Sequence, residues 1–102
     1  MLPYSLTPSA QADLEEIARY TLEKWGEKQA IKYAASLDDC FENIAQGRAI
    51  HRAFSKTLPQ VQVTRCEHHF VFFLKSETGK PRIIAILHER MRFIDRLKHR
   101  LS

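Results

Sequence analysis

The chain of 102 residues contains no apolar run near the ~20 residues that a membrane-spanning helix needs. Its N-terminus has neither a basic stretch nor a long apolar stretch, so a secretory signal is not expected. The sequence also lacks repeats, low-complexity tracts and linkers. We therefore expect a single domain over residues 1–102 that makes no membrane contact and works in the cytoplasm.

Cysteine is scarce, with Cys40 and Cys66 alone. In a reducing cytoplasm two such thiols are usually small buried side chains and not a bridge. Cys66 stands close in sequence to His68 and His69, and His88 follows later, which raises the question of a metal site. The cluster lacks the paired spacing of structural zinc motifs, and adjacent residues of a strand point to opposite faces. We expect no metal and no other cofactor.

The charges are unevenly distributed along the chain. Residues 1–46 carry eight acids against four bases, whereas residues 47–102 carry twelve bases against four acids. A basic half attracts acidic partners, such as nucleic acid, an acidic protein segment or an enzyme surface that handles DNA. A solvated surface would show the same imbalance, so the charge supports a partner without identifying it.

The first half of the sequence predicts a short strand over residues 2–6 and two helices, over about residues 8–25 and 27–46. Thr7 can cap the first helix, since its hydroxyl can accept a hydrogen bond from a free backbone N–H. Gly26 is a natural stop. Because the link at Gly26 is so short, the two helices should form an antiparallel hairpin.

The second half begins with a basic loop over residues 48–59 and continues with strand signals near residues 61–64, 70–74 and 83–87. Short turns between these strands predict an antiparallel meander. Residues 88–102 alternate apolar and basic side chains at helical spacing, which predicts a basic amphipathic helix. The expected fold class is α+β, of order βααβββ plus the basic helix, with the hairpin packed on one face of a small sheet.

This order of elements resembles the RelE/ParE toxin superfamily, and several motifs are similar to those of plasmid-borne ParE toxins. The motifs are LTPSAQADLEEIARYT at residues 6–21, RCEHHFVF at residues 65–72, ILHERM at residues 86–91 and RLKHRL at residues 96–101. They occur in order and extend over nearly the whole chain. The resemblance is therefore to the ParE branch of the superfamily.

The resemblance implies a toxin that inhibits DNA gyrase, with or without bound DNA, and blocks replication without being an enzyme. Such toxins serve plasmid maintenance and are neutralised in a hetero-oligomer with a ParD-type antitoxin. The antitoxin has a DNA-binding N-terminal part and a flexible C-terminal part that wraps the toxin. Contact with operator DNA is therefore expected only through the antitoxin.

Five basic residues of the last segment are the candidates for contact with gyrase. They are Arg90, Arg92, Arg96, Lys98 and Arg100. We expect them to meet an acidic gyrase surface or gyrase-bound DNA. A solvated helix face above a packed apolar stripe is the alternative interpretation.

The antitoxin is expected to bind a groove of the hairpin and an edge of the sheet. Trp25, Tyr20 and Tyr33 are candidates, because large amphipathic side chains often remain partly exposed and anchor partners. An amphipathic antitoxin helix could lay its apolar face there, while an extended segment adds a strand. Acidic antitoxin residues could pair with Arg65 and Arg82.

A ribosome-dependent mRNA endoribonuclease of the RelE type is the enzymatic alternative. Cleavage through the 2′-OH needs a base, an acid and cations for the phosphate. The chain offers Glu67, His68, His88, Arg65, Arg82 and Lys56. RelE-type enzymes usually place a tyrosine after their last strand, whereas no tyrosine follows Tyr33 here. A plain nucleic-acid-binding domain is a third possibility, supported by little beyond charge.

Overall fold

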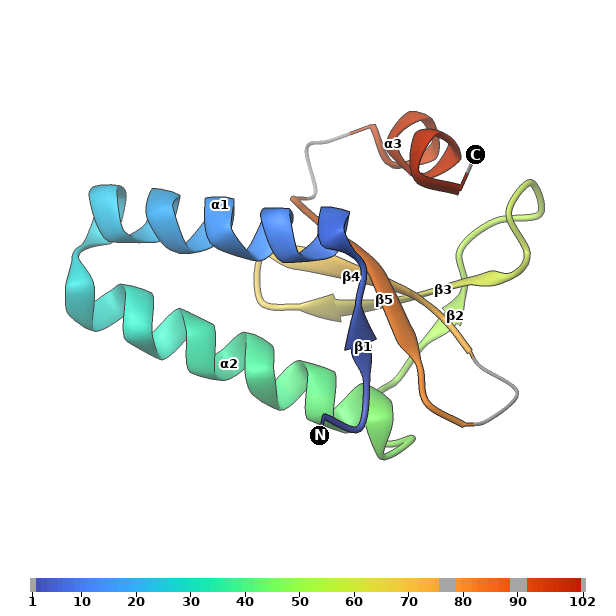
Figure 1. Cartoon of the computed structure of the whole chain (residues 1–102), viewed down its shortest axis with the longest axis horizontal. Helices are drawn as coiled ribbons and strands as arrows, with labels where there is room; N and C mark the ends of the chain where they lie inside the picture. The colour runs from blue at the N-terminus through green and yellow to red at the C-terminus, as the bar shows by residue number, and fades with distance from the viewer. Residues whose placement is uncertain (1, 76–78, 89–91, 102) are drawn as a thin grey trace.

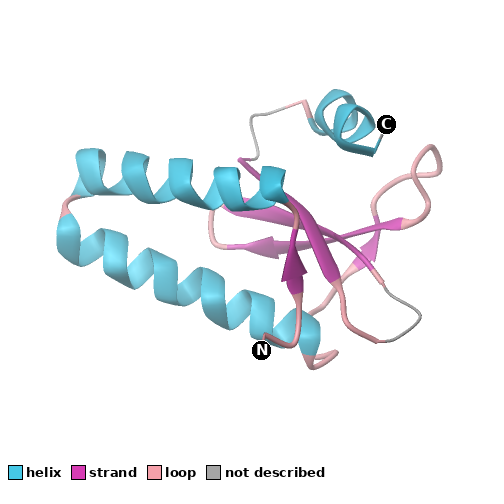
Figure 2. Ribbon diagram, in the orientation of Figure 1, coloured by secondary structure: helices cyan, strands magenta, loops and turns pink. Residues whose placement is uncertain are grey.

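The computed structural model describes residues 2–75, 79–88 and 92–101. In these residues three helices and five strands follow one another, and Figure 1 and Figure 2 show how they are arranged. In order they are β1 (Ser5–Leu6), α1 (Pro8–Trp25), α2 (Glu27–Ala45), β2 (Arg52–Ala53), β3 (Val61–Cys66), β4 (His69–Leu74), β5 (Arg82–His88) and α3 (Phe93–Leu101). The α+β fold class predicted from the sequence is confirmed.

The hairpin of α1 and α2 forms for the reasons seen in the sequence. The Thr7 side chain accepts a hydrogen bond from Ala10 N at 3.1 Å and caps α1, and Pro8 occupies the first turn. Gly26 joins the helices with φ 91°, a conformation that other residues rarely adopt. The antiparallel pair extends past the sheet, so that its tip is not covered by strands (Figure 1).

The sheet has the strand order β1-β5-β4-β3-β2. The antiparallel meander of β3, β4 and β5 is confirmed, and β1 lies at an edge, pairing in parallel with β5. The prediction of a loop over residues 48–59 was incomplete, because β2 pairs with β3 there. Two residues carry too little periodicity to be recognised as a strand before the partner is known.

Each face of the sheet has its own apolar core. On the hairpin face Leu37, Phe41 and Ile44 of α2 pack against side chains of β4 and β5. On the opposite face Leu97 of α3 is fully buried, and Phe93 packs beside it. Two sheet faces buried by different helices explain why β4 and β5 are nearly continuous apolar runs.

The C-terminal helix is shorter than the predicted 88–102. Strand β5 continues to His88, where it pairs with His69, and α3 begins at Phe93. The helical spacing of apolar residues in this segment overlapped the end of the strand, and pairing with β4 decided the boundary. None of the helices in the described ranges is long and apolar enough to cross a membrane.

Candidate functional site

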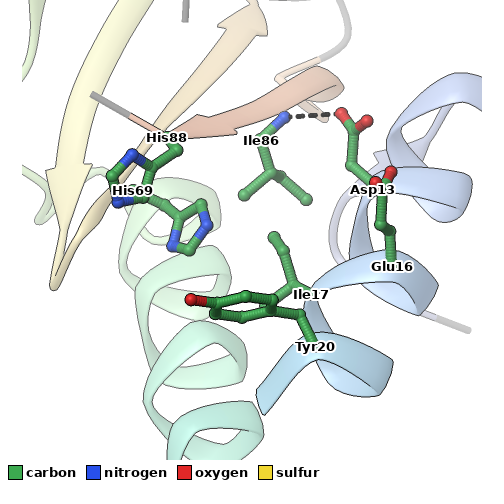
Figure 3. A pocket seen from close by; sticks show the side chains of 7 residues that line it. All are labelled: Asp13, Glu16, Ile17, Tyr20, His69, Ile86 and His88. Carbon is green, nitrogen blue, oxygen red and sulfur yellow. Dashed lines mark hydrogen bonds between the residues drawn. The ribbon is translucent and has the colours of Figure 1, made fainter. Parts of the chain in front are cut away.

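A cleft opens where α1 and α2 pass the ends of β4 and β5. Its two adjoining cavities, each of about 380 Å³, share Tyr20, His69 and His88. Figure 3 shows the first cavity, with α1 on one side and the two histidines on the other. We call this site the hairpin–sheet cleft; its lining comprises Asp13, Glu16, Ile17, Tyr20, Thr21, Trp25, Gln29, Tyr33, His68, His69, Ile86 and His88.

Two aromatic residues of the cleft are unusually exposed for their size. Tyr20 exposes 60% and Trp25 exposes 66% of its surface, and both lie near the end of α1. Leu22, which is also on this turn of the helix, exposes 51%. A cluster of exposed large apolar side chains marks a binding surface more often than a single exposed apolar side chain does.

The floor of the cleft is a hydrogen-bonded group of aromatic side chains. Tyr33 Oη lies 2.6 Å from His69 Nδ1 and accepts a hydrogen bond from His68 N at 3.3 Å. The His69 ring packs edge-on against His88, with centroids 5.4 Å apart. Burial, reinforced by His88 and His68, lowers the pKa of His69 from 6.5 to about 4. His69 is therefore neutral at pH 7 and suits an apolar or hydrogen-bonding ligand rather than an anion.

The other wall of the cleft contains a paired charge at the open edge of β5. Strand β1 pairs with β5 only as far as Ile83, so the backbone groups beyond it need other partners. Asp13 accepts a hydrogen bond from Ile86 N at 2.9 Å, and Arg100 donates to the Ile84 carbonyl at 3.0 Å. The side chains of an acid and a base thus replace the missing part of an edge strand.

Asp13 and Arg100 also bind each other. The two guanidinium nitrogens of Arg100 lie 2.6 and 2.8 Å from the two carboxylate oxygens of Asp13. Their side chains are only 15% and 12% exposed, so this bidentate pair is shielded from solvent. It connects α1, β5 and α3. Arg100, predicted to contact gyrase, is thus held inside the molecule, and of the four predicted basic residues that the structure describes it is the least available to a partner.

The other described candidates, in α3 and just before it, have solvent-facing positions. Arg92, Arg96 and Lys98 are exposed, and Arg92 makes one ion pair, with Asp95 at 3.7 Å. Both members of that pair are strongly exposed, at 89% and 70%. The fifth candidate, Arg90, lies outside the described residues. We call these three exposed cations, Arg92 just before α3 and Arg96 and Lys98 on either side of the buried Leu97, the basic surface of α3.

The structure brings together three of the five predicted antitoxin residues. Tyr20, Trp25 and Tyr33 all line the hairpin–sheet cleft. Arg65 and Arg82 do not. Arg65 pairs with Phe70 and its guanidinium lies over that ring at 5.6 Å, whereas Arg82 pairs with Leu74.

Phe70 and Leu74 both pack in the α3-side core, so Arg65 and Arg82 belong to the face opposite the cleft. They also lie at opposite ends of the meander, since Phe70 is near the start of β4 and Leu74 is its last residue. Sequence separation could not show this, because strand register and face determine which side a residue occupies. The five antitoxin candidates therefore lie on two faces of the sheet, with Tyr20, Trp25 and Tyr33 in the cleft and Arg65 and Arg82 on the opposite face.

Sequence reasoning missed the roles of Asp13 and His69. Asp13 was noted as part of a motif, and His69 as an unlikely zinc ligand. One signal was available for Asp13, because it lies one helical turn before Ile17 on the stripe of α1 that faces the sheet. An acid on such a stripe needs a buried partner. No signal pointed to Arg100 as that partner, since the two residues are far apart in sequence.

Comparison with known proteins identifies relatives that match most or all of the chain. The family model of the ParE toxin of type II toxin–antitoxin systems, parDE, matches residues 4–93. "Toxin ParE" of Escherichia coli is 41% identical over 102 residues, covering 100% of this chain and 99% of that protein. "Toxin ParE1" of Mycobacterium tuberculosis is 33% identical over 88 residues, covering 86% of this chain and 90% of that protein.

A solved structure described as "Chromosomal ParDE TA system from P. aeruginosa" has a TM-score of 0.68 and 22% identity, covering 83% of this chain and 95% of that one. At this identity the likeness supports the fold alone. The family match extends from β1 to the start of α3 and includes every residue named above as lining the cleft. The chain therefore belongs to the ParE toxins of type II toxin–antitoxin systems, within the RelE/ParE superfamily.

Proposed function

We propose that this toxin inhibits DNA gyrase through the basic surface of α3, makes no covalent change itself, and is neutralised by a ParD-type antitoxin in the hairpin–sheet cleft. The observation that carries the proposal is the separation of two different surfaces. Arg92, Arg96 and Lys98 are exposed on one side of the sheet, and Tyr20 and Trp25 are exposed on the other. A target and an inhibitor of the toxin then need not recognise the same residues.

The charge of α3 suits a target that carries negative charge, such as an acidic protein surface or DNA held by an enzyme. Phe93 and Leu97 anchor the helix on the sheet, so the cations are presented from a packed support. A toxin that acts on gyrase works where the chromosome is, which is the cytoplasm.

The cleft suits an amphipathic antitoxin helix. Trp25 and Tyr20 offer large apolar surface, while the exposed Gln29 and His68 offer polar groups at the rim. Arg65 and Arg82, on the far face, would meet the antitoxin only if its flexible C-terminal part continues around a sheet edge. The short edge strand β2 leaves one such edge for an added strand.

Charge reversal on the basic surface of α3 tests whether this surface inhibits gyrase. The triple variant Arg92→Glu, Arg96→Glu and Lys98→Glu should need at least about tenfold more protein to inhibit supercoiling, because the attraction to an acidic surface becomes repulsion. The matched control reverses Lys24, Lys28 and Lys32 of the hairpin, giving the same change in net charge. Equal loss in both variants, or in neither, would contradict a role for α3 in particular.

The ribonuclease alternative is tested beside it with ribosomes and mRNA. No lysine or arginine is among the described residues that line the cleft, although His68, His69 and His88 lie there. A site that cleaves RNA needs cations near the scissile phosphate. Ribosome-dependent cleavage of mRNA that disappears in His88→Ala, with supercoiling unaffected, would replace the gyrase proposal.

A further inference from the structure

The two cysteines of the chain meet between α2 and β3. Cys66 is 7% exposed and belongs to the hairpin-side core, against which the partly buried Cys40 packs. Cys66 Sγ lies 3.7 Å from the Ser36 carbonyl oxygen, as expected for a weak S–H donor. In an α-helix that same carbonyl accepts the N–H of residue 40, so Cys66 lies directly beside Cys40.

The two thiols differ in exposure and in acidity. Cys66 is buried, whereas Cys40 is only partly buried and can be reached by a small reagent. The hydrogen bond from Cys66 lowers the pKa of Cys40, while the same contact and burial raise the pKa of Cys66. Because the thiolate is the reactive form, Cys40 is the nucleophile of the pair. A reachable, more acidic thiol beside a second thiol is the arrangement of redox-sensing cysteines.

We propose that Cys40 and Cys66 are an oxidation site at which peroxide produces an intramolecular disulfide between α2 and β3. In the first step the Cys40 thiolate attacks one oxygen of hydrogen peroxide. The O–O bond breaks, hydroxide leaves, and Cys40 becomes a sulfenic acid, so that sulfur loses the two electrons that peroxide gains. In the second step Cys66 sulfur attacks Cys40 sulfur. The S–S bond forms, the S–O bond breaks, and the departing hydroxide takes the Cys66 proton and leaves as water.

The disulfide would close a loop over residues 40–66 and fix α2 to the sheet. That loop contains β2, and the turn that follows it holds His68, whose N–H donates to Tyr33 of α2. Oxidation therefore adds a covalent connection beside the existing hydrogen bond between α2 and the β3–β4 turn. The proposal concerns the fold itself and stands whether or not gyrase is the target.

The test uses the full chain treated with hydrogen peroxide and analysed by intact mass before and after a reducing agent. The wild type should lose the mass of two hydrogen atoms as a monomer, lose both alkylatable thiols, and recover them on reduction. Its Tm should rise by at least about 5 °C, because the unfolded chain is constrained. A wild-type chain that keeps two alkylatable thiols, gains oxygen on a cysteine or forms linked dimers would overturn the proposal; oxygen gained on its two methionines would not.

Two single variants assign the steps. Cys66→Ala should accumulate sulfenic acid on Cys40, which dimedone labels, because no second thiol is present to displace the oxygen. Cys40→Ala should remain largely unlabelled, because Cys66 is buried. Dimedone labelling of Cys66 in the folded Cys40→Ala variant at the rate of Cys40 would show that the assigned order of attack is wrong. The wild-type mass needs neither variant, so the proposal stays testable if one of them fails to fold.

Discussion

The hairpin–sheet cleft and the basic surface of α3 hold their polar groups in contrasting ways. In the cleft, Asp13 and His69 are partly buried, and each has partners fixed by the fold at hydrogen-bonding distance. On α3, Arg92 and Lys98 are exposed, and the one ion pair described there is long and solvated. Removing one member of a shielded pair is costly because the other is left buried and unpaired, whereas an exposed charge stays solvated and remains available for a partner. The sheet thus separates a side with shielded, hydrogen-bonded polar groups from a side with exposed charges.

Among the variants that test this difference, Asp13→Ala should cause the largest loss of stability. The change leaves Arg100 poorly solvated without its carboxylate and leaves Ile86 N–H without an acceptor. We expect a loss of about 3 kcal/mol in the free energy of unfolding, measured by urea denaturation. A loss below about 1 kcal/mol would mean that the pair behaves like a surface ion pair.

The second prediction concerns pH. His69 has a folded pKa of about 4, below its ordinary 6.5, so the unfolded chain binds the proton more tightly. The stability that this group provides is complete above about pH 6.5 and is lost as the pH falls from there toward 4. Between pH 7 and 4.5 the loss attributable to His69 should be about 2 kcal/mol.

Denaturation curves of His69→Gln at the two pH values measure this contribution. The variant should show the smaller decrease in stability on acidification, because it no longer gains a proton on unfolding. Equal acid sensitivity in wild type and His69→Gln would assign the effect to other groups.

The third prediction tests docking on the cleft side. Trp25→Ala removes a large side chain that is mostly exposed, so folding stability should change little. Affinity for the antitoxin should fall by about tenfold or more, since aromatic anchors dominate binding energy. Titration calorimetry measures it, and Ile50→Ala, at a 94% exposed site outside the cleft, is the matched control.

The smallest expected effect is on the α3 side. Asp95→Ala breaks the exposed pair with Arg92 and should change the free energy of unfolding by less than about 0.5 kcal/mol. It is also the counterpart of Asp13→Ala, since each removes the carboxylate of one Asp–Arg pair. If Asp13→Ala and Asp95→Ala lost a comparable free energy of unfolding, the shielded pair and the exposed pair would not differ in their contribution to stability.

Much of the fold could be predicted because its signals are local. The Thr7 cap, the Gly26 stop and the helical spacing between them define the hairpin within a few residues of its observed bounds. The apolar runs around Phe72 and Ile84 likewise predict strands covered on both faces. The position of β2 and the end of β5 were less predictable, since both depend on pairing with distant residues.

The candidate site could be predicted only in part. Trp25, Tyr20 and Tyr33 were chosen for their size and amphipathic character, and they do line one cleft. Arg65 and Arg82 were added for their charge, and the register of the sheet places them on the other face. The residue type indicates which contacts a side chain can make, but the register of its strand decides on which face of the sheet the side chain lies.

By itself the sequence determined the family, the α+β class, the hairpin and the basic character of the last segment, because these follow from motifs and from periodicity over short ranges. Only the tertiary structure decided that Arg100 turns inward to Asp13 and that Cys40 meets Cys66. Each of these contacts joins residues more than twenty positions apart. Such pairs are selected by how whole elements pack, and no local pattern encodes that packing.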